Sequence, residues 1–472
     1  MQVKFISAIT KITLFCIFIV MFGYDAIAIQ PSDFTQPEVC GGCHTEIYAQ
    51  WNGSMHSNSH KDPVYEKLFI MVSKEMNRTF DPFCSKCHVP IDFLSGNIPS
   101  ADNYKVSEIS EKGISCDFCH TVNASSGIGN GAFISSPGKI KRGPFDDSDY
   151  STFHQIEYSQ LHTRSEFCGM CHDVYHPFNG LVLENTYSEW KEGPYNETTV
   201  CQDCHMTPGV TMFKANKGRA AAGAPMREHI YTHYIVGGNA MLPELLGSPE
   251  HERLAKERLR SAAKIEIIKF KKKEDNKSMD LIVKVTNIGA GHKLPTGLTE
   301  ARQIWLEIEA KDVSGKTIFE SGKIDADGYI DHDAIKYHTV FGDAQGKPTE
   351  KVWLAEKILL DNRIPPKGYS EENFSFALPQ DARYPLSVDV RLNYVSASQE
   401  LSDLLFGKGK VKPPVIEMAS VKGTIDGIQY TPGKNIPGFS SFFLLMVIFI
   451  FSLIKRMKTG VGIVGKEMFE KI

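Results

Sequence analysis

The chain has 472 residues, of which 42% are hydrophobic, so it is long enough for two or three domains with buried cores. Its formal net charge of -4 at pH 7 lacks the basic excess that nucleic-acid binding requires, and we expect no nucleic-acid partner. Ten of the eleven cysteines recur in closely spaced pairs, so cysteine chemistry is the first property to interpret.

The first 28 residues have the pattern of a secretory signal peptide. Lys4 and Lys11 precede an apolar run from Ile12 to Phe22, and Ala26-Ile27-Ala28 offers small residues for cleavage. Cys16 lies inside the apolar run, where we interpret it as part of the signal core and not as a lipid-modified residue. The pattern predicts that the mature chain is exported.

The string Cys-x-x-Cys-His occurs five times between residues 40 and 205. In this motif two thioether bonds attach a haem covalently, and the histidine that follows binds the iron. Zinc knuckles or disulfides would leave cysteines at other spacings, and outside the signal peptide none remains. The expected attachment residues are Cys40, Cys43, Cys84, Cys87, Cys116, Cys119, Cys168, Cys171, Cys201 and Cys204, and the expected proximal ligands are His44, His88, His120, His172 and His205. The motifs predict five covalently bound c-type haems.

Residues 29–262, which contain all five motifs, are predicted to form a mostly α-helical or irregular multihaem cytochrome domain. So little chain per haem cannot build an ordinary core, and the porphyrins must supply much of the buried apolar area. Residues 250–264, rich in Glu, Arg, Lys, Leu and Ala and preceded by Ser248-Pro249, are predicted to form a helix that leads out of this domain.

Residues 263–422 differ in texture, because apolar and polar side chains alternate there with the period of half-buried strands. The alternating segments are residues 264–270, 281–286, 303–308, 386–391 and 415–418. Glycine and asparagine turns separate them. The pattern predicts an all-β domain, an antiparallel sandwich of immunoglobulin-like or fibronectin-like type.

The C-terminal residues are predicted to anchor the protein. A polar linker over 423–438 leads to an apolar run over 439–454, which we interpret as a transmembrane or sorting helix. The basic cluster that follows predicts that residues 455–472 form a cytoplasmic tail, with the cytochrome on the outer face of the membrane or on the cell surface. Together, Pro437-Gly438, the apolar run and the basic cluster resemble the sorting signal of archaeal surface proteins.

The sixth coordination position of each iron decides between electron transfer and catalysis. A second histidine closes the iron for electron transfer, whereas an open iron can take a substrate. Eleven histidines lie outside the motifs. His162 stands just upstream of the fourth motif, and His292 lies in a glycine-rich turn where the backbone could approach a porphyrin closely. The alternative for His292 is a turn histidine that is bonded to backbone.

Several longer segments resemble a known family. The segment from Cys40 to His44 with Trp51 and His56, followed by residues 113–120 and 165–172, resembles the tetrahaem cytochrome that takes electrons from hydroxylamine oxidoreductase, and its relatives in metal-reducing bacteria and archaea. Residues 187–190, 201–206, 233–239, 289–297 and 301–305 resemble the larger surface or periplasmic multihaem cytochromes. Together these segments span most of the mature chain.

The resemblance implies distal ligands for particular haems. It assigns His56 to the haem of the third motif, His154 to that of the first and His233 to that of the fourth. The tetrahaem relative leaves its second haem without a distal side chain, so the resemblance implies that the haem of Cys84 and Cys87 is the open one.

These observations predict an electron carrier with no catalytic residues. Its expected donor is a membrane oxidoreductase, and its expected acceptors are other cytochromes or extracellular compounds. One alternative is a haem enzyme that reduces or oxidises a small nitrogen or sulfur compound at an open haem. Another is a subunit of an extracellular cytochrome filament, in which a neighbouring subunit completes one haem.

Overall fold

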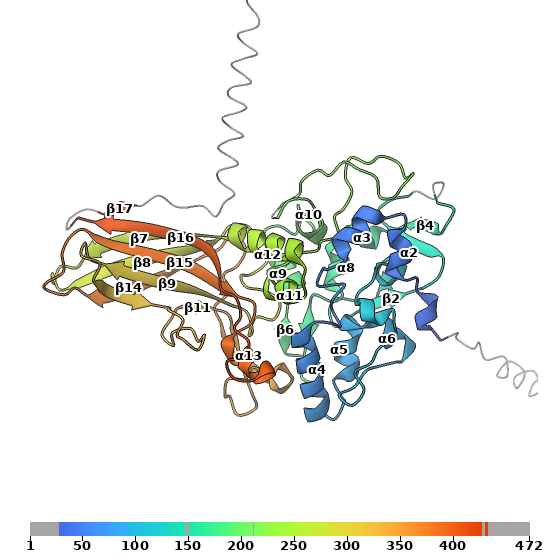
Figure 1. Ribbon diagram of the computed structural model, residues 1–472, viewed down its shortest axis with the longest axis horizontal. Helices are drawn as coiled ribbons and strands as arrows, with labels where there is room; N and C mark the ends of the chain where they lie inside the picture. Colours follow the sequence, from blue (N-terminus) through green and yellow to red (C-terminus); the bar gives the residue numbers. More distant parts are fainter. Residues whose placement is uncertain (1–27, 147–150, 211, 427–429, 433–472) are drawn as a thin grey trace, which may run out of the picture.

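The computed structural model describes residues 28–146, 151–210, 212–426 and 430–432. Figure 1 shows two lobes side by side, a lobe of short helices that carries the N-terminal part of the chain and an elongated lobe of strands, with helix α12 at the junction. The predicted signal peptide, apart from Ala28, lies outside the described residues. The predicted membrane segment at 439–454 also lies outside them.

The helical lobe is built from short helices joined by irregular segments. Each of the five motifs begins in a helix, so that its cysteines and histidine lie on one or two turns. The Asp62 side chain caps α4 by accepting hydrogen bonds from the amides of Val64 and Tyr65. The helices are α2 (Pro37–Gly41), α3 (Thr45–Trp51), α4 (Pro63–Glu75), α5 (Asp81–His88), α6 (Pro90–Ser95), α7 (Cys116–Thr121), α8 (Ser165–Gly169), α9 (Thr186–Glu192), α10 (Cys201–His205) and α11 (Met241–Leu245).

Small ladders also occur in this lobe. Two are antiparallel and one is parallel, and none exceeds four residues a strand. They pair β1 (Val122–Ser125) with β2 (Phe133–Ser135), β3 (Ile140–Gly143) with β4 (Gln155–Tyr158), and β5 (Val174–Tyr175) with β6 (Val182–Glu184). Such ladders cannot bury a face of their own, so the lobe depends on its interior for stability.

Longer strands form the second lobe. Strands β10, β9, β15, β16 and β17 pair in that order, with β11 beside β9, and a second sheet has the order β14, β8, β7. A separate ladder joins β12 and β13. The strands are β7 (Ala263–Lys272), β8 (Ser278–Asn287), β9 (Gln303–Lys311), β10 (Thr317–Ser321), β11 (Lys336–Tyr337), β12 (Thr339–Gly342), β13 (Lys357–Asp361), β14 (Tyr369–Ala377), β15 (Leu386–Val395), β16 (Ile416–Ile425) and β17 (Tyr430–Pro432).

The core of the strand lobe follows the predicted alternation. Met279, Leu281 and Val283 of β8 are fully buried, and so are Val388 and Val390 of β15. These side chains belong to one apolar cluster between the six-stranded and three-stranded sheets. Alternate residues of a strand point to the same face, so each sheet turns one apolar face to this shared core. The five predicted strands are confirmed, with longer bounds than the sequence suggested.

Helix α12 (Pro249–Ala262) joins the lobes without a loop, because β7 begins at Ala263. The predicted helix at 250–264 is thereby confirmed, with its end two residues earlier than expected. Proline at its first position fits the helix start, where the missing amide hydrogen costs no bond. A rigid connection of this kind fixes where the strand lobe stands against the helical lobe.

The predicted fold class is wrong in its overall statement. No helix among the described residues is long and apolar enough to cross a membrane, and the 16-residue run behind the prediction is shorter than the roughly 20 residues that a span requires. The region after residue 262 is also not all-β, because helix α13 (Gln399–Phe406) follows β15 and packs on the helical lobe. Its strands fall into sheets of six, three and two.

Candidate multihaem site

The helical lobe surrounds one large cavity, of about 1610 Å³, that extends to the strand lobe. All five motif histidines line it, together with nine of the ten motif cysteines; Cys84 is the exception. The surface of the cavity is mostly apolar. Five attachment motifs that are dispersed over 166 residues of sequence therefore face one common space, which is large and apolar enough to suit several porphyrins.

Cysteines of different motifs contact one another in this cavity. The thiols of the first and third motifs (Cys40 and Cys116), the second and fourth (Cys87 and Cys171), and the fourth and fifth (Cys168 and Cys201) lie close enough to shift one another's pKa. All the motif cysteines are free of disulfides. The attachment sites therefore adjoin in pairs, and the fourth motif touches both the second and the fifth.

Four motif histidines face a second imidazole. Metal–nitrogen bonds of about 2 Å on either side of one ion place the centres of two imidazole rings roughly 6 Å apart. The observed separations match this value. The ring centres are 6.3 Å apart for His44 and His154, 6.4 Å for His120 and His233, 6.2 Å for His172 and His56, and 6.5 Å for His205 and His292. The four pairs therefore have the spacing of bis-histidine haem ligation.

Hydrogen bonds orient most of these rings for metal binding. In six of the eight paired rings, and in His88, Nδ1–H donates to a backbone carbonyl, which leaves Nε2 free to bind iron. The donor and acceptor residues are His44 and Ala220, His88 and Ser59, His120 and Arg142, His205 and Val236, His154 and Gln155, His233 and Tyr231, and His292 and Lys293, with distances of 2.5 to 3.2 Å. The tautomer is thereby fixed by the fold before any iron binds.

Burial favours the neutral form of several of these imidazoles, the form that binds a metal. It lowers the pKa of His56 to about 3 and the pKa values of His88 and His233 to about 4. The pKa values of His205 and His292 are lowered as well, again mainly by burial. The charged form of a histidine is disfavoured where water cannot solvate it.

The structure places the expected distal histidines differently from the resemblance in two cases. His154 faces the first motif, as expected. His56 faces His172 of the fourth motif and not the third, whereas His233 faces His120 of the third motif and not the fourth. The two expected assignments are exchanged. The amide of Ile114 donates to the carbonyl of His56, so the backbone there runs beside the third motif while the imidazole turns toward the fourth.

His162 has a different environment from the other candidates. Its Nε2 donates to the carbonyl of Cys119 at 3.0 Å, and its ring stacks on His120 with the centres 5.8 Å apart. The nitrogen that distal ligands leave free is engaged here with backbone. Through this hydrogen bond, His162 stabilises helix α7, which carries the third motif.

Replacing His162 with Ala is expected to leave the number of low-spin haems unchanged, because the Nε2 atom of this residue is bonded to protein. Electron paramagnetic resonance of the oxidised protein measures this number directly. The matched variant is His154→Ala, which removes an imidazole that faces His44 and should convert one low-spin signal to high-spin. A new high-spin signal in His162→Ala would show that His162 does bind a haem iron.

The second motif lacks a facing imidazole. All histidines of the chain are among the described residues, and none of them makes a ring contact with His88 like those of the four pairs, although the charge of His60 acts on it. Instead the Tyr65 ring stacks on His88 with the centres 3.8 Å apart. His60, which precedes α4 and the second motif in the sequence, stacks on Tyr104 with the ring centres 4.6 Å apart. The Tyr65 hydroxyl is buried and has no partner.

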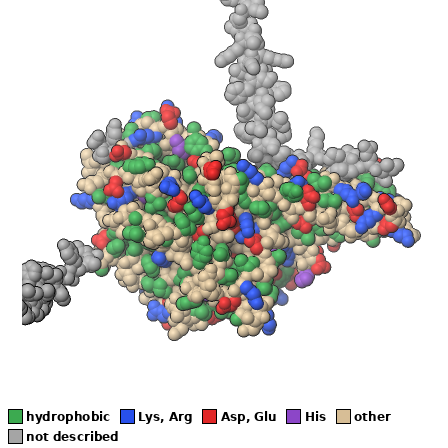
Figure 2. Space-filling model, turned by 180° about the vertical axis from the view of Figure 1, so that it is seen from behind, with side chains coloured by type: hydrophobic (Ala, Val, Ile, Leu, Met, Phe, Trp, Pro, Cys, Tyr) green, Lys and Arg blue, Asp and Glu red, His purple; other side chains and the backbone are tan. Residues whose placement is uncertain are grey.

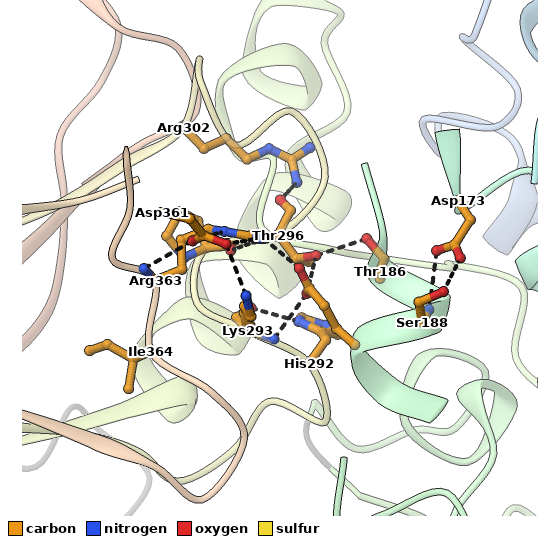
Figure 3. A network of polar contacts seen from close by, with 12 residues as sticks. Asp173, Thr186, Ser188, His292, Lys293, Thr296, Arg302, Asp361, Arg363 and Ile364 are labelled. Carbon is orange, nitrogen blue, oxygen red and sulfur yellow. Dashed lines mark hydrogen bonds and ion pairs between the residues drawn. The ribbon is translucent and has the colours of Figure 1, made fainter. Parts of the chain in front are cut away.

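His292 reaches the helical lobe from the loop between β8 and β9. Figure 3 shows the polar network that holds this loop. The carboxylate of Glu189, on α9, accepts hydrogen bonds from the Lys293 amide at 3.0 Å and the Thr296 hydroxyl at 2.8 Å. The Arg363 guanidinium pairs with the same carboxylate at 2.5 Å. These hydrogen bonds and this ion pair therefore hold the loop that carries His292 against α9 of the helical lobe.

The ion pair between Glu189 and Arg363 is deeply buried. Their side chains are 2% and 4% exposed, and Arg363 also makes two contacts to Asp361, at 2.8 and 3.0 Å. Burial works to raise the pKa of Asp361, but hydrogen bonds from Arg363 and Lys293 lower it to about 2. The sequence gives no sign of this pair, because 174 residues separate Glu189 from Arg363 and no local pattern marks either one.

Three of the remaining histidines outside the motifs make structural bonds or face solvent. His251 joins Ser248 to the carbonyl of Gln50, and His176 binds the carbonyl of Trp353. The side chain of His332 is fully exposed. These residues show why a count of spare histidines overestimates the supply of ligands.

The motifs, the shared cavity and the facing imidazoles define a class, the multihaem c-type cytochromes with covalently bound haem. Residues 39–121, which contain the first three motifs, match the family model described as cytochrome c554 and c-prime. None of the curated proteins matches the chain.

Two solved structures are similar to the chain. One is a penta-heme cytochrome c552 from Thermochromatium tepidum, with 20% sequence identity, a TM-score of 0.58, and coverage of 84% of this chain and 100% of that chain. The other is the Northeast Structural Genomics Consortium target SoR45, with 11% identity and a TM-score of 0.14 over 34% of this chain and 81% of that chain. The first shows a shared fold; the TM-score of the second is too low to carry an argument.

Proposed function

We propose that this chain is a pentahaem electron carrier, exported from the cytoplasm, that relays electrons between redox proteins. The observation that carries the proposal is the set of four imidazole pairs, at 6.2 to 6.5 Å, around one cavity lined by all five motifs. Bound haem would supply one-electron exchange at iron. The proposed donor is a membrane oxidoreductase, and the proposed acceptors are other cytochromes or extracellular compounds.

The chain's own residues have three tasks in this function. The motif cysteines hold the porphyrins covalently and, by adjoining across motifs, keep the sites close together. The paired imidazoles of His44 with His154, and of the three other pairs, would bind the iron of a bound haem from both sides and so exclude other ligands. The apolar lining excludes water, which reduces the reorganisation that accompanies a change of iron charge.

A second candidate function is a haem enzyme that acts on a small nitrogen or sulfur compound. The observation in its favour is the absence, among the described residues, of an imidazole that faces His88. The site of Cys84 and Cys87 would then be the one that admits a substrate. The buried Tyr65 hydroxyl is the polar group beside it.

Ferric spin states test both candidates. We expect mass spectrometry of the protein to show five attached haems. We expect its electron paramagnetic resonance spectrum to show the signals of four low-spin haems and one high-spin haem, with the high-spin signal unaffected by nitrite or hydroxylamine. Fewer than five haems would contradict the pentahaem proposal. A high-spin signal that shifts with either compound, together with turnover of that compound, would favour the enzyme. A fifth low-spin haem that forms only in assembled oligomers would favour the other alternative, a subunit of an extracellular cytochrome filament in which a neighbouring subunit completes one haem.

A further inference from the structure

The guanidinium of Arg258 lies in the cavity without a charge partner. Arg258 is on α12 and lines the cavity. Its Nη2 atom donates to the carbonyl of Cys204 at 2.9 Å, in the fifth motif, whereas its Nε atom is buried and has no hydrogen-bond partner. Within the part of the chain that the structure describes, no carboxylate forms an ion pair with it. Figure 2 shows Lys, Arg, Asp and Glu side chains spread over the face of the molecule that it draws.

Burial of an unpaired cation is costly, and proteins retain such a group where a counter-ion offsets the cost. The burial lowers the pKa of Arg258 to about 10, which still leaves the group charged at neutral pH. After burial, the Arg258 charge is the first cause of the lowered pKa of His205, and it also contributes at His292. The cation therefore lies close to both imidazoles of the fifth pair.

We propose that Arg258 is the cationic partner of a haem propionate at the fifth site and that it raises the reduction potential of that haem. A guanidinium presents two parallel N–H donors in the geometry that a carboxylate accepts, and the free Nε atom of Arg258 belongs to such a fork. The haem is the carboxylate-bearing group that the fifth motif would bring to this position. A fixed positive charge near the iron disfavours the oxidised form, which carries one more positive charge than the reduced form.

The structure also allows a purely structural role, in which Arg258 caps the short helix α10 through the Cys204 carbonyl. The two roles are separable by substitution. Arg258→Gln retains an amide donor for that carbonyl but removes the charge, whereas Arg258→Lys retains the charge. Arg253→Gln is the matched control, because Arg253 lies on the same helix but is 51% exposed and pairs with Glu250 and Glu257 on the surface.

The experiment is a spectroelectrochemical titration of the full holoprotein. Arg258→Gln is expected to lower the potential of one haem, with at least a tenfold change in its reduction equilibrium, equivalent to about 59 mV for one electron. This haem should be the one that His292→Met also shifts. Arg258→Lys should recover most of the potential, and Arg253→Gln should change none.

Unchanged potentials in Arg258→Gln would overturn the proposal. An equal shift in Arg258→Lys would also overturn it, because the charge would then be irrelevant; this variant serves as the test if the glutamine variant does not fold. The inference rests on the proposed pentahaem function. Counting the haems by mass spectrometry distinguishes a failure of the inference from a failure of that function. Five haems with unchanged potentials reject only the role of Arg258, whereas fewer than five reject the function.

Discussion

Replacing His292 with Met is expected to raise the reduction potential of one haem, on the order of 0.1 V, and to leave the other four unchanged. Axial ligands set haem potentials over a range of about 0.8 V, and a thioether favours the reduced iron more than an imidazole does. His292 faces His205 at 6.5 Å and lies on the strand lobe, so this substitution tests whether that lobe completes a site of the helical lobe. Spectroelectrochemical titration gives the five potentials.

Two further variants make the His292 result specific. His292→Ala should convert one low-spin haem to high-spin, because the fifth iron loses its distal imidazole. His332→Ala is the control, since the side chain of His332 is fully exposed and faces no motif histidine. If His292→Ala keeps every low-spin signal of the parent protein, His292 is a turn residue bonded to backbone, and the strand lobe has no part in ligation.

Replacing Arg363 with Met is expected to lower the free energy of unfolding by about 3 to 5 kcal/mol. The substitution leaves the Glu189 carboxylate buried without its cationic partner, in a place where water cannot solvate it. Chemical denaturation followed by circular dichroism measures the change. The same variant should broaden or shift the low-spin signal of the fifth haem, because Glu189 also binds the Lys293 amide next to His292.

The comparison variants separate charge from geometry at this pair. Arg363→Lys should restore part of the stability, because an ammonium keeps the charge but lacks the planar fork that contacts both Glu189 and Asp361. Arg253→Met removes exposed ion pairs and should cost less than about 1 kcal/mol. Equal losses in Arg363→Met and Arg253→Met would show that the buried pair does not fasten the two lobes together.

Local patterns predicted much of the fold. The strands β7, β8, β9, β15 and β16 follow from alternation, because a half-buried strand exposes every second side chain. Alternation did not reveal strand β14, since polar residues dominate its pattern and its side chains are mostly exposed. Helix α13 was also not predicted, because its apolar residues pack against α4 and α11 of the other lobe and have no strand neighbour.

The expected distal histidines show the limit of such reasoning. The resemblance placed His154 opposite the first motif and exchanged His56 with His233. The segments that carry His56 and His233 lie side by side, since the His233 amide donates to Gln50 at 2.8 Å, and the charges of His172 and His233 both act on His56. Sequence order cannot tell which of two adjacent imidazoles turns to which motif.

The sequence by itself predicts the haem attachment residues and the proximal histidines, because each motif holds its two thiols and its imidazole within five consecutive residues, and short-range geometry suffices to bring them together. Tertiary structure alone decided the partners of these motifs. His172 and His56 are 116 residues apart, and His205 and His292 are on different lobes. The positions of these histidines depend on long-range packing and on buried contacts such as the ion pair of Glu189 with Arg363. Such contacts stabilise the fold only when distant segments of the chain come together and exclude water between them.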